Sequence, residues 1–401
     1  MIDFELTEEH LMVEKMVREF AAKEVAPYIA ELDREHRFDR TILDKMADLG
    51  LLGICIPEKY GGSGFDYVSL GLACEELEFV DTSLRVIMSV HVGLTSMTLA
   101  AWATEEQKQK YLVPLAKGER IGCFGLTEPN AGSDAVAIQS TAVKKGDKYI
   151  LNGEKMWISL ADVADVFFVF AWTDQEKKKR RDHSGISAFI LERGMPGLTS
   201  ATIHGKLGIR AGNTGSFSMN DVEVPAENLV GKEGEGFKIA MFGLDQGRFT
   251  VAAGATGLVR ACLEASKSYA LSRRAFERPI AEFQLVKEMI ANMVAGYETS
   301  RLLWLRAAWL KNKGIRNTRE TALAKWVACD ASERAASDAV QIHGAYGYSD
   351  EYPVERFYRN CKAAVIYEGS REIQKLIQAD YALGFRQDKE LRVKLPPWPF
   401  E

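Results

Sequence analysis

The chain has 401 residues, 47% of them hydrophobic, so it is long enough to bury two or three cores. Its 51 basic and 56 acidic residues are interspersed and give a net charge of −5, which leaves no basic face for nucleic acid or anionic lipid. These values favour a multi-domain protein and argue against nucleic acid as a partner.

The start of the chain and its cysteines bear on the compartment. Residues 1–5 show no basic segment followed by an apolar one, and no apolar run is expected to approach membrane-spanning length. The six cysteines lie far apart and form no C-x-x-C pair, which is typical of reduced core residues. We therefore expect a cytoplasmic protein without membrane insertion.

Helical periodicity marks the first part of the chain, from Thr7 to about Lys117. Apolar residues recur there at spacings of three and four, as on a buried helix face: Met12, Val13, Met16, Val17 and Phe20. Residues Thr104–Gln107 have the spacing of a capping box ahead of a short helix. The glycine-rich stretch 61–64 follows no strand, so it is a poor candidate for a phosphate-binding loop.

Short β-rich runs begin near Gly118 and predict a small β domain; they cover 121–127, 140–144, 149–152, 166–172, 186–191 and 217–224. Turn residues at 145–148 and at Asn152-Gly153 indicate hairpins. The charged run 175–181 is predicted to be a solvated loop.

After Gly236 the helical period returns in long segments, among them 281–311 and 320–340. We predict an α+β fold that is mainly α, with a helical domain at 1–118, a β domain at 119–235, a helical bundle at 236–386 and a tail at 387–401. The sequence shows no β-α-β alternation and no G-x-G-x-x-G after a strand, which disfavours a nicotinamide enzyme.

Two polar motifs in the β domain are candidates for binding a flat ring. In Phe124–Asp134 a strand breaks into a loop whose free N–H groups, with the hydroxyls of Thr127 and Ser133, can bind ring carbonyls or pyrophosphate oxygens. Trp157, in M-W-I-S, can cover an aromatic ring. A structural turn and a core tryptophan are the alternative interpretations.

Glu368 lies in V-I-Y-E-G-S-R-E-I-Q, where an apolar run meets a glycine. A carboxylate held against apolar surroundings has a raised pKa, and Gly369 lets the backbone approach a ligand closely. The motif predicts a general base, while a solvated carboxylate before the last helix is the simpler interpretation of Y-E-G alone.

Taken together and in this order, F-G-L-T-E-P-N-A-G-S-D, M-W-I-S and Y-E-G-S-R-E-I-Q resemble the acyl-CoA dehydrogenase family. The resemblance extends from Leu6 to about Leu383, and it is supported by Tyr269–Phe276 with Gln284 and by Gln341–Tyr348. It implies an N-terminal helical domain, a β-barrel-like middle domain and a C-terminal four-helix bundle.

The resemblance also implies FAD as the cofactor, held between the β domain and the bundle, no metal, and a homotetramer. Positions matching FAD contacts within one chain are Phe124, Leu126, Thr127, Gly132, Ser133, Trp157, Ile158, Ser159, Ser370 and Glu372. Positions matching contacts from a neighbouring subunit are Arg273, Phe276, Gln284, Gln341, Gly344 and Ala345. Glu277 and Ala345 stand where many members have glycine, so the adenosine contacts are not carried over in detail.

The implied reaction is α,β-dehydrogenation of an acyl-CoA thioester to the 2-enoyl-CoA, in which Glu368 removes the α proton while hydride passes to flavin N5. The thioester oxygen is met by the backbone N–H of the base and a ribityl hydroxyl. An electron-transferring flavoprotein is the implied acceptor. Positions matching substrate contacts are Ser133, Asp245, Arg248, Tyr367, Gly369, Arg85 and Ser89. An ordinary i, i+3 ion pair explains Asp245 and Arg248 equally well.

The sequence leaves two classes of acyl group open, a short or polar chain and the glutaryl group. Arg85 resembles the arginine of glutaryl-CoA dehydrogenases that contacts a distal carboxylate. Three further positions of that pocket match: Glu78, Ser89 and Tyr367. Residues 352–356 resemble short-chain and medium-chain members instead, and Arg85 can simply pair with Asp81 or Glu78. A short-chain or polar acyl-CoA is predicted, with decarboxylating glutaryl-CoA dehydrogenation as the alternative.

Two other functions are disfavoured. Acyl-CoA oxidases share the fold but are usually much longer chains. A non-catalytic flavoprotein that binds nucleic acid needs a basic surface, whereas this chain is net acidic and has Glu368.

Overall fold

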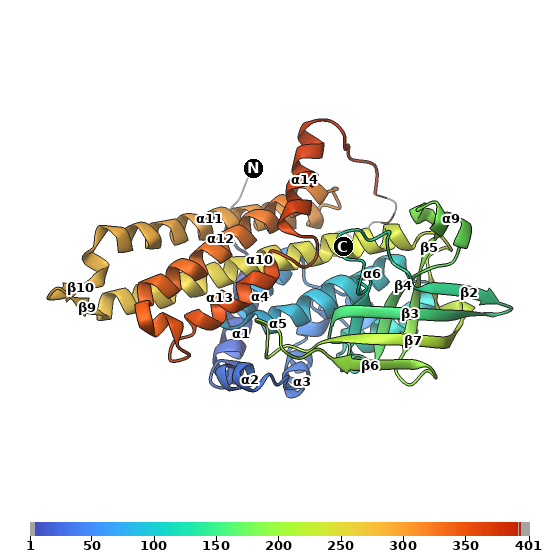
Figure 1. Ribbon diagram of the computed structural model, residues 1–401, viewed down its shortest axis with the longest axis horizontal. Coiled ribbons are helices and arrows are strands. Elements are labelled where there is room, and N and C mark those ends of the chain that lie inside the picture. The colour runs from blue at the N-terminus through green and yellow to red at the C-terminus, as the bar shows by residue number, and fades with distance from the viewer. Residues whose placement is uncertain (1–4, 392, 394–401) are drawn as a thin grey trace.

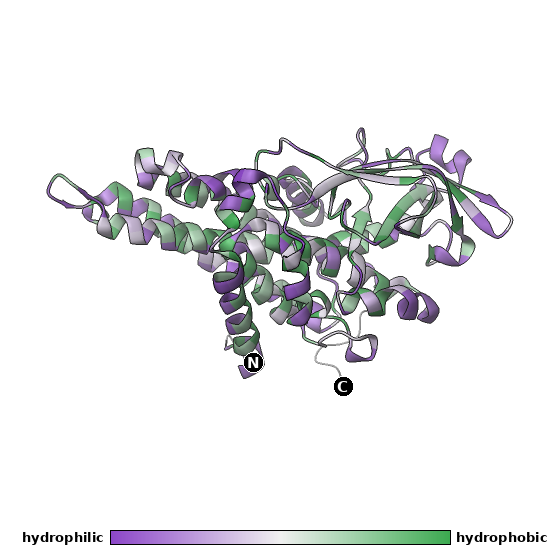
Figure 2. Cartoon of the chain, turned by 90° about the horizontal axis from the view of Figure 1, so that it is seen from below, coloured by the Kyte–Doolittle hydropathy of each residue, from purple (hydrophilic) through white to green (hydrophobic). Residues whose placement is uncertain are grey.

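The computed structural model describes residues 5–391 and 393; residues 1–4 and most of the predicted tail lie outside the described residues. Long helices form one end of the molecule and a β-sheet the other, and the N-terminal helices pack alongside both (Figure 1). Hydrophobic residues gather where elements meet and hydrophilic ones on the outer turns (Figure 2).

The N-terminal part is helical, as predicted. Its elements are α1 (Glu8–Phe20), η1 (Ala21–Val25), α2 (Ile29–Glu35), α3 (Thr41–Asp48), η2 (Leu51–Gly53), η3 (Glu58–Tyr60), α4 (Tyr67–Val80), α5 (Thr82–Ile87), η4 (Met88–Ser96), α6 (Met97–Trp102), α7 (Glu105–Gln107), η5 (Lys108–Leu112) and α8 (Val113–Ala116). The capping box at Thr104 is present, since its hydroxyl accepts from the Gln107 N–H at 3.2 Å. On α1 the buried face holds Val13, Val17 and Phe20, whereas Met12 is exposed.

The middle part contains one eight-stranded mixed sheet. Its strands are β1 (Gly122–Gly125), β2 (Thr141–Lys145), β3 (Lys148–Ser159), β4 (Val166–Trp172), β5 (Ile186–Glu192), β6 (Leu198–Thr202), β7 (Thr214–Pro225) and β8 (Leu229–Val230). The order is β6-β7-β3-β2-β4-β5-β8, with β1 parallel to β4. All seven residues of β4 are buried, which is typical of a strand covered on both faces.

The C-terminal part is a bundle around α10 (Gly236–Ser272), which packs against α4, α11 (Gln284–Asn312) and α12 (Thr318–His343). A two-stranded hairpin of β9 (Arg274–Ala275) and β10 (Arg278–Pro279) joins α10 to η8 (Ile280–Glu282) and α11. After α12 come η9 (Gly344–Tyr348), α13 (Val354–Ala364) and α14 (Arg371–Ala382). The type of element changes near residues 118 and 235, while the domain limits themselves stay a prediction.

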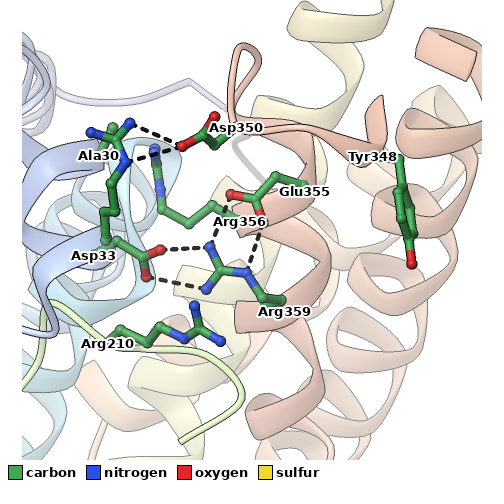
Figure 3. A pocket seen from close by; sticks show the side chains of 9 residues that line it. Ala30, Asp33, Arg210, Tyr348, Asp350, Glu355, Arg356 and Arg359 are labelled. Carbon is green, nitrogen blue, oxygen red and sulfur yellow. Dashed lines mark hydrogen bonds and ion pairs between the residues drawn. The ribbon is translucent and has the colours of Figure 1, made fainter. Parts of the chain in front are cut away.

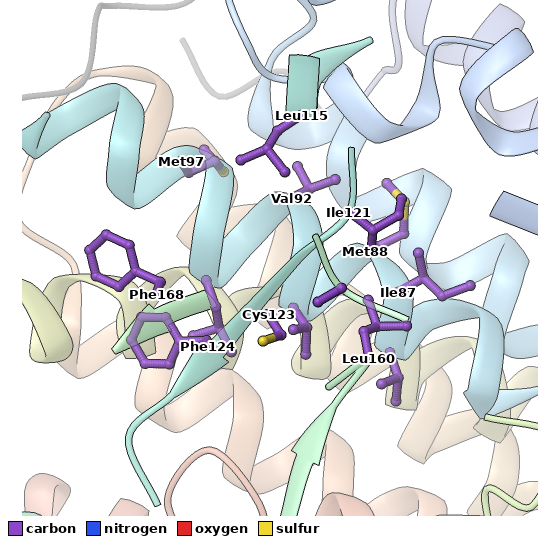
Figure 4. Close-up of a cluster of buried hydrophobic side chains, with 14 of the residues drawn as sticks. Ile87, Met88, Val92, Met97, Leu115, Ile121, Cys123, Phe124, Leu160 and Phe168 are labelled. Atoms are coloured by element: carbon purple, nitrogen blue, oxygen red, sulfur yellow. The ribbon is translucent and has the colours of Figure 1, made fainter. Parts of the chain in front are cut away.

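A buried cluster anchors β1 to the N-terminal helices (Figure 4). Cys123 and Phe124 of β1 lie among apolar side chains such as Met88 and Val92 of η4. This helical run, Thr82–Trp102, is long and apolar enough to cross a membrane, so the expectation that no run approaches that length is wrong. Because 89% of its most apolar window is buried inside the protein, we assign it to the core.

Two local predictions are also wrong. Residues Gln175–Lys179 form the short helix α9 instead of a loop, because the Asp174 carboxylate accepts from the N–H groups of Glu176 and Lys177 at 3.0 Å. Asn152-Gly153 is no hairpin turn: β3 continues through it, with a register shift against β7 between Leu151 and Gly153. The hairpin predicted at 145–148 joins β2 to β3.

Candidate active site

Glu368 lies in the turn between α13 and α14, with a left-handed backbone conformation at φ 54°. The residue is half-buried, but its Oε2 atom is shielded from solvent and has no hydrogen-bond partner among the described residues. Gly369 follows at φ 93°, where a glycine is unstrained. The turn therefore presents an unpaired carboxylate oxygen inside the protein.

The electrostatic surroundings fit a general base. Burial raises the pKa of Glu368 to about 7, and the positive charges of Arg85, Lys325 and Arg248 oppose that rise. A carboxylic acid with a pKa near neutrality is ionised in part at pH 7, so it can both accept and return a proton. Desolvation thus prepares the group that the sequence motif indicated.

Glycine on α10 makes room for this carboxylate. A Cβ atom on Gly247 would lie 1.9 Å from Glu368 Oε2, so any larger residue there would require the carboxylate to move. One turn earlier, a Cβ on Gly243 would touch Thr98 and Phe124. Small residues on α10 therefore let Glu368, Thr98 and Phe124 lie close against this helix.

Arg85 lies in a buried polar cluster beside the base. Its Nε donates to Glu78 Oε2 at 2.6 Å, its Nη1 donates to Ser89 Oγ at 3.0 Å, and its Nη2 donates to the hydroxyl of Tyr367. Both Arg85 and Glu78 are essentially inaccessible to solvent. Of the two pairings considered from the sequence, the structure has Glu78 and not Asp81.

Asp81 has another role. Its carboxylate caps α5 by accepting from the Ser83 N–H at 2.8 Å and pairs with Arg356 at 2.9 Å. The predicted pair Asp245 and Arg248 is present on α10 at 2.9 Å. Arg248 also donates from Nε to the Glu368 carbonyl at 3.2 Å, so this pair contacts the turn that carries the base.

The Phe124–Asp134 segment leaves β1 and becomes a loop, as predicted. A buried ion pair fixes it: Lys155 Nζ donates to Glu128 Oε1 at 2.7 Å and to the Leu126 carbonyl at 3.2 Å. Thr127 accepts through its carbonyl from the Met156 N–H at 3.0 Å, which joins the loop to β3. At the loop tip, a Cβ atom added to Gly132 would meet no described atom within 4 Å, so the loop is open there.

The surroundings of Trp157 fit a flat cofactor. Trp157 is 56% exposed with φ 63°, so the alternative of a core tryptophan is wrong. Its neighbour Ile158 is buried, whereas Ser159 is half-buried at the end of β3. An exposed indole beside an open polar loop can cover an aromatic ring, and the FAD that the sequence predicts fits these residues.

The residues predicted to contact FAD from a neighbouring subunit lie away from the Phe124–Asp134 loop of their own chain. Arg273 and Phe276 lie at the β9–β10 hairpin, at the opposite end of the molecule from β2 and β3 (Figure 1). Phe276 is 88% exposed, and the side chains of Gln284 and Gln341 are also exposed. Gly344 and Ala345 are exposed at the end of α12, and Ser370 with Glu372 begins α14.

A hollow in the described part of the molecule lies among charged side chains between α2 and α13 (Figure 3). Arg359 bridges Asp33 and Glu355, and Arg34 pairs with Asp350. This hollow of about 160 Å³ contains none of the predicted site residues. Its paired charges join the N-terminal helices to the bundle.

Sequence inspection missed two lysines near the site. Lys155 is fully buried under the loop after β1, and Lys325 is fully buried beside the Glu368 turn. The signal for Lys325 was present, because it lies one helical turn from buried Thr321 and buried Cys329 on α12. A lysine on an otherwise apolar or small-residue helix face indicates a buried polar partner.

Three family descriptions match successive parts of the chain. They are "Acyl-CoA dehydrogenase, N-terminal domain" over residues 7–119, "middle domain" over 123–222 and "C-terminal domain" over 234–383. The chain is 45% identical over 376 residues to the short-chain specific acyl-CoA dehydrogenase of Clostridium acetobutylicum, covering 94% of this chain and 98% of that one. It is 41% identical over 391 residues to the glutaryl-CoA dehydrogenase of Desulfococcus multivorans, covering 96% and 99%.

The similar solved structures also include both a butyryl-CoA dehydrogenase and a glutaryl-CoA dehydrogenase. Butyryl-CoA dehydrogenase from Megasphaera elsdenii matches with a TM-score of 0.92 at 42% identity, covering 95% of this chain and 100% of that one. A glutaryl-CoA dehydrogenase in complex with glutaryl-CoA matches at 0.92 and 40%, covering 96% and 98%. A chain solved in work on the electron-transferring flavoprotein of Acidaminococcus fermentans matches at 0.93 and 47%, covering 95% and 100%. Overall similarity therefore does not choose between the acyl groups.

Proposed function

The chain belongs to the acyl-CoA dehydrogenase family of FAD-dependent enzymes, and we propose that it converts a short-chain or polar acyl-CoA to the 2-enoyl-CoA with Glu368 as the base. The observation that carries this proposal is the buried, unpartnered Oε2 of Glu368, in a carboxyl group whose pKa burial raises to about 7. An oxygen without a partner is free to accept the α proton of the substrate.

The chain's own residues supply the proton transfer and part of the charge stabilisation. The backbone N–H of Glu368 donates to no group in the described part of the chain, so it is available to the thioester oxygen as negative charge develops there. Arg248 and Asp245 lie beside the same turn, where they can orient the pantetheine arm. FAD, when bound between the Thr127 loop and the bundle, supplies the acceptor for the hydride from the β carbon.

Glu368→Gln tests the base. The variant is expected to fold and to bind FAD, while dehydrogenation falls by about 100- to 10,000-fold, the range that a general base contributes. Full activity in Glu368→Gln would show that another group removes the proton. Bleaching of the flavin absorbance by butyryl-, isobutyryl- and glutaryl-CoA is the measurement, because it reports the first half of the reaction alone.

The second candidate substrate is glutaryl-CoA, and the Arg85 cluster is the observation that favours it. Two observations argue against glutaryl-CoA. Glu78 already neutralises the charge of Arg85, and all three nitrogens of the Arg85 guanidinium donate to protein groups. A distal carboxylate would meet a guanidinium whose charge is already paired and which has two N–H groups left to donate. Because the charge of Arg85 is already paired, we rank a short acyl chain first.

A paired variant separates the two substrates. Removing Arg85 alone would leave Glu78 charged and buried, so Arg85→Met is combined with Glu78→Gln. If Arg85 binds a carboxylate, this double variant loses turnover of glutaryl-CoA selectively and keeps that of butyryl-CoA. Equal effects on both substrates, or no advantage of glutaryl-CoA in the parent enzyme, would leave Arg85 with a structural role only.

Three further parts of the proposal concern assembly and partners. We propose an electron-transferring flavoprotein as acceptor, in keeping with the 47% identity to the Acidaminococcus chain, and a homotetramer whose FAD sites are shared between subunits. Rapid peroxide formation during turnover would favour an oxidase instead. The cytoplasmic location also stays a prediction, since the relatives include a mouse enzyme named as mitochondrial.

A further inference from the structure

Side chains from α12 and α14 hold the backbone of the turn that carries Glu368. Lys325 Nζ donates to the Tyr367 carbonyl at 3.0 Å and to the Gly369 carbonyl at 2.9 Å, so it bridges the residues on either side of the base. Gln374 Nε2 also donates to the Gly369 carbonyl, at 2.9 Å. With Arg248 on the Glu368 carbonyl, three successive carbonyls of the turn are occupied.

These hydrogen bonds stabilise an unfavourable backbone conformation at Glu368. A left-handed backbone at Glu368 is sterically disfavoured for a residue with a Cβ atom and persists only where neighbouring contacts fix it. Hydrogen bonds from an ammonium group are charge-assisted and stronger than neutral ones. Lys325 makes two of them, from a side chain that is fully buried.

Lys325 is also the cation near the base that lacks a carboxylate partner. Arg85 pairs with Glu78 at 2.6 Å and Arg248 pairs with Asp245 at 2.9 Å. Lys325 has no acidic group within 4.0 Å among the residues that the structure describes. Among the described residues, Arg371 at the start of α14 is paired with Asp330 and Glu333 of α12. The Tyr367 hydroxyl and the thiols of Cys329 on α12 and Cys74 on α4 stay neutral, because burial raises their pKa values.

We propose that Lys325 is a positioning residue for the base: it fixes the Tyr367–Gly369 turn and sets a net positive charge beside the Glu368 carboxylate. The inference rests on the proposed role of Glu368. A positive charge stabilises the ionised carboxylate, so Lys325 keeps the base deprotonated at lower pH than burial alone would allow. Lys325 then contributes to both the geometry of the turn and the protonation state of the base.

Lys325→Met is the first test, because methionine keeps a similar volume and removes both the charge and the donors. In the holoenzyme, the acidic limb of the pH profile for flavin bleaching by butyryl-CoA should move upward by about half a pH unit or more. The plateau rate at high pH should also fall about tenfold or more, because the turn loses two of its hydrogen bonds. A direct readout is the infrared band of the protonated Glu368 carboxyl, identified by its absence in Glu368→Gln, whose titration midpoint should move upward by the same amount.

Two further variants keep the test decisive. Lys325→Arg retains the charge but not the ammonium geometry, so it should keep the acidic limb in place and still lower the plateau. Lys311→Met is the matched control: Lys311 is also a buried lysine of the bundle, but it donates to the Asp245 carbonyl and to Gln246 instead of the Glu368 turn. It should leave the acidic limb unmoved, whatever it does to stability.

The outcomes distinguish this inference from the proposed function. If Lys325→Met leaves both the limb and the infrared midpoint unchanged while Glu368→Gln is inactive, the inference is wrong and the base assignment stands. The same holds if Lys311→Met moves the limb as far as Lys325→Met does. If Glu368→Gln is fully active, the proposed function fails first.

Discussion

At the scale of single residues, Glu368 combines an ionisable group with a site that disfavours its charge. Since burial raises its pKa to about 7, the dehydrogenation rate should rise with pH and reach half its maximum near pH 7. The pH dependence of flavin bleaching at saturating substrate measures this. A rate that is flat between about pH 5.5 and 8.5 would contradict the assignment, because an ordinary carboxyl is ionised throughout that window.

The same carboxyl should lower the stability of the protein at high pH. Its folded pKa lies above the unfolded value of 4.5, so the folded state binds the proton more tightly, and stability is lost as pH rises from about 4.5 to about 7. Glu368→Gln has no such loss. Its melting temperature relative to the parent should therefore be higher at pH 8 than at pH 5, whereas an equal difference at both would contradict the linkage.

Which residues form this site was only partly predictable from the sequence. Local motifs indicated Glu368, Thr127 and Trp157 as candidates, since each depends on a turn or strand end that neighbouring residues specify. The partner of Arg85 was not decidable, because α4 ends and α5 begins between Glu78 and Arg85. The helical spacing rule favours Asp81, but Asp81 is the extended N-cap of α5, and its carboxylate binds the Ser83 N–H and Arg356 instead.

At the scale of elements, the glycine of α10 opposite the base offers a direct test of packing. In Gly247→Ala the added Cβ would lie 1.9 Å from Glu368 Oε2, so the carboxylate must move, although alanine stabilises a helix by about 1 kcal/mol relative to glycine. We expect flavin bleaching by butyryl-CoA to slow about tenfold or more. The melting temperature should fall by no more than a few degrees.

Gly296→Ala on α11 is the control for that prediction. A Cβ there would meet Ala331 Cβ at 3.3 Å and lies away from the Glu368 turn. Unchanged activity in Gly247→Ala, or an equal loss in Gly296→Ala, would show that the close approach at Gly247 does not position the base.

The long elements were predicted better than the short ones for a physical reason. The periodic segments 281–311 and 320–340 correspond to α11 and α12, since many residues contribute to one helical pattern. By contrast, α9 depends on a single cap at Asp174, and the passage of β3 through Gly153 depends on the close approach of Ser140. Contacts of that kind are set by the tertiary structure and leave little trace in a local sequence pattern.

A buried ionic network joins the elements of the bundle and gives a prediction for stability. Glu75 of α4 accepts from Tyr297 at 3.0 Å, Arg301 at 2.5 Å and Trp304 at 3.2 Å, all on α11. Glu75→Ala leaves Arg301 without this partner and should cost about 3–5 kcal/mol. Urea denaturation of the holoenzyme measures it, with Glu264→Ala as control, since the exposed Glu264–Lys267 pair is worth at most about 1 kcal/mol.

At the scale of the whole molecule, the predicted FAD contacts fall into two groups that one chain does not bring together. Thr127 and Trp157 lie at the sheet, whereas Arg273 and Phe276 lie at the far hairpin of β9 and β10 (Figure 1). The strong exposure of Phe276 is unusual for a large apolar side chain and is expected of an interface. A shared site between two copies satisfies both observations.

Subunit complementation tests this arrangement. One copy carries Glu368→Gln, and the other carries Arg273→Ala with Phe276→Ala; each protein alone is expected to be inactive, the first for lack of the base and the second for weak FAD binding. In a co-expressed mixed assembly, half of the shared sites between unlike subunits combine an intact base with an intact hairpin. Activity should therefore reappear only on co-expression, and its absence in an assembly shown to contain both chains would mean that each chain binds FAD by itself.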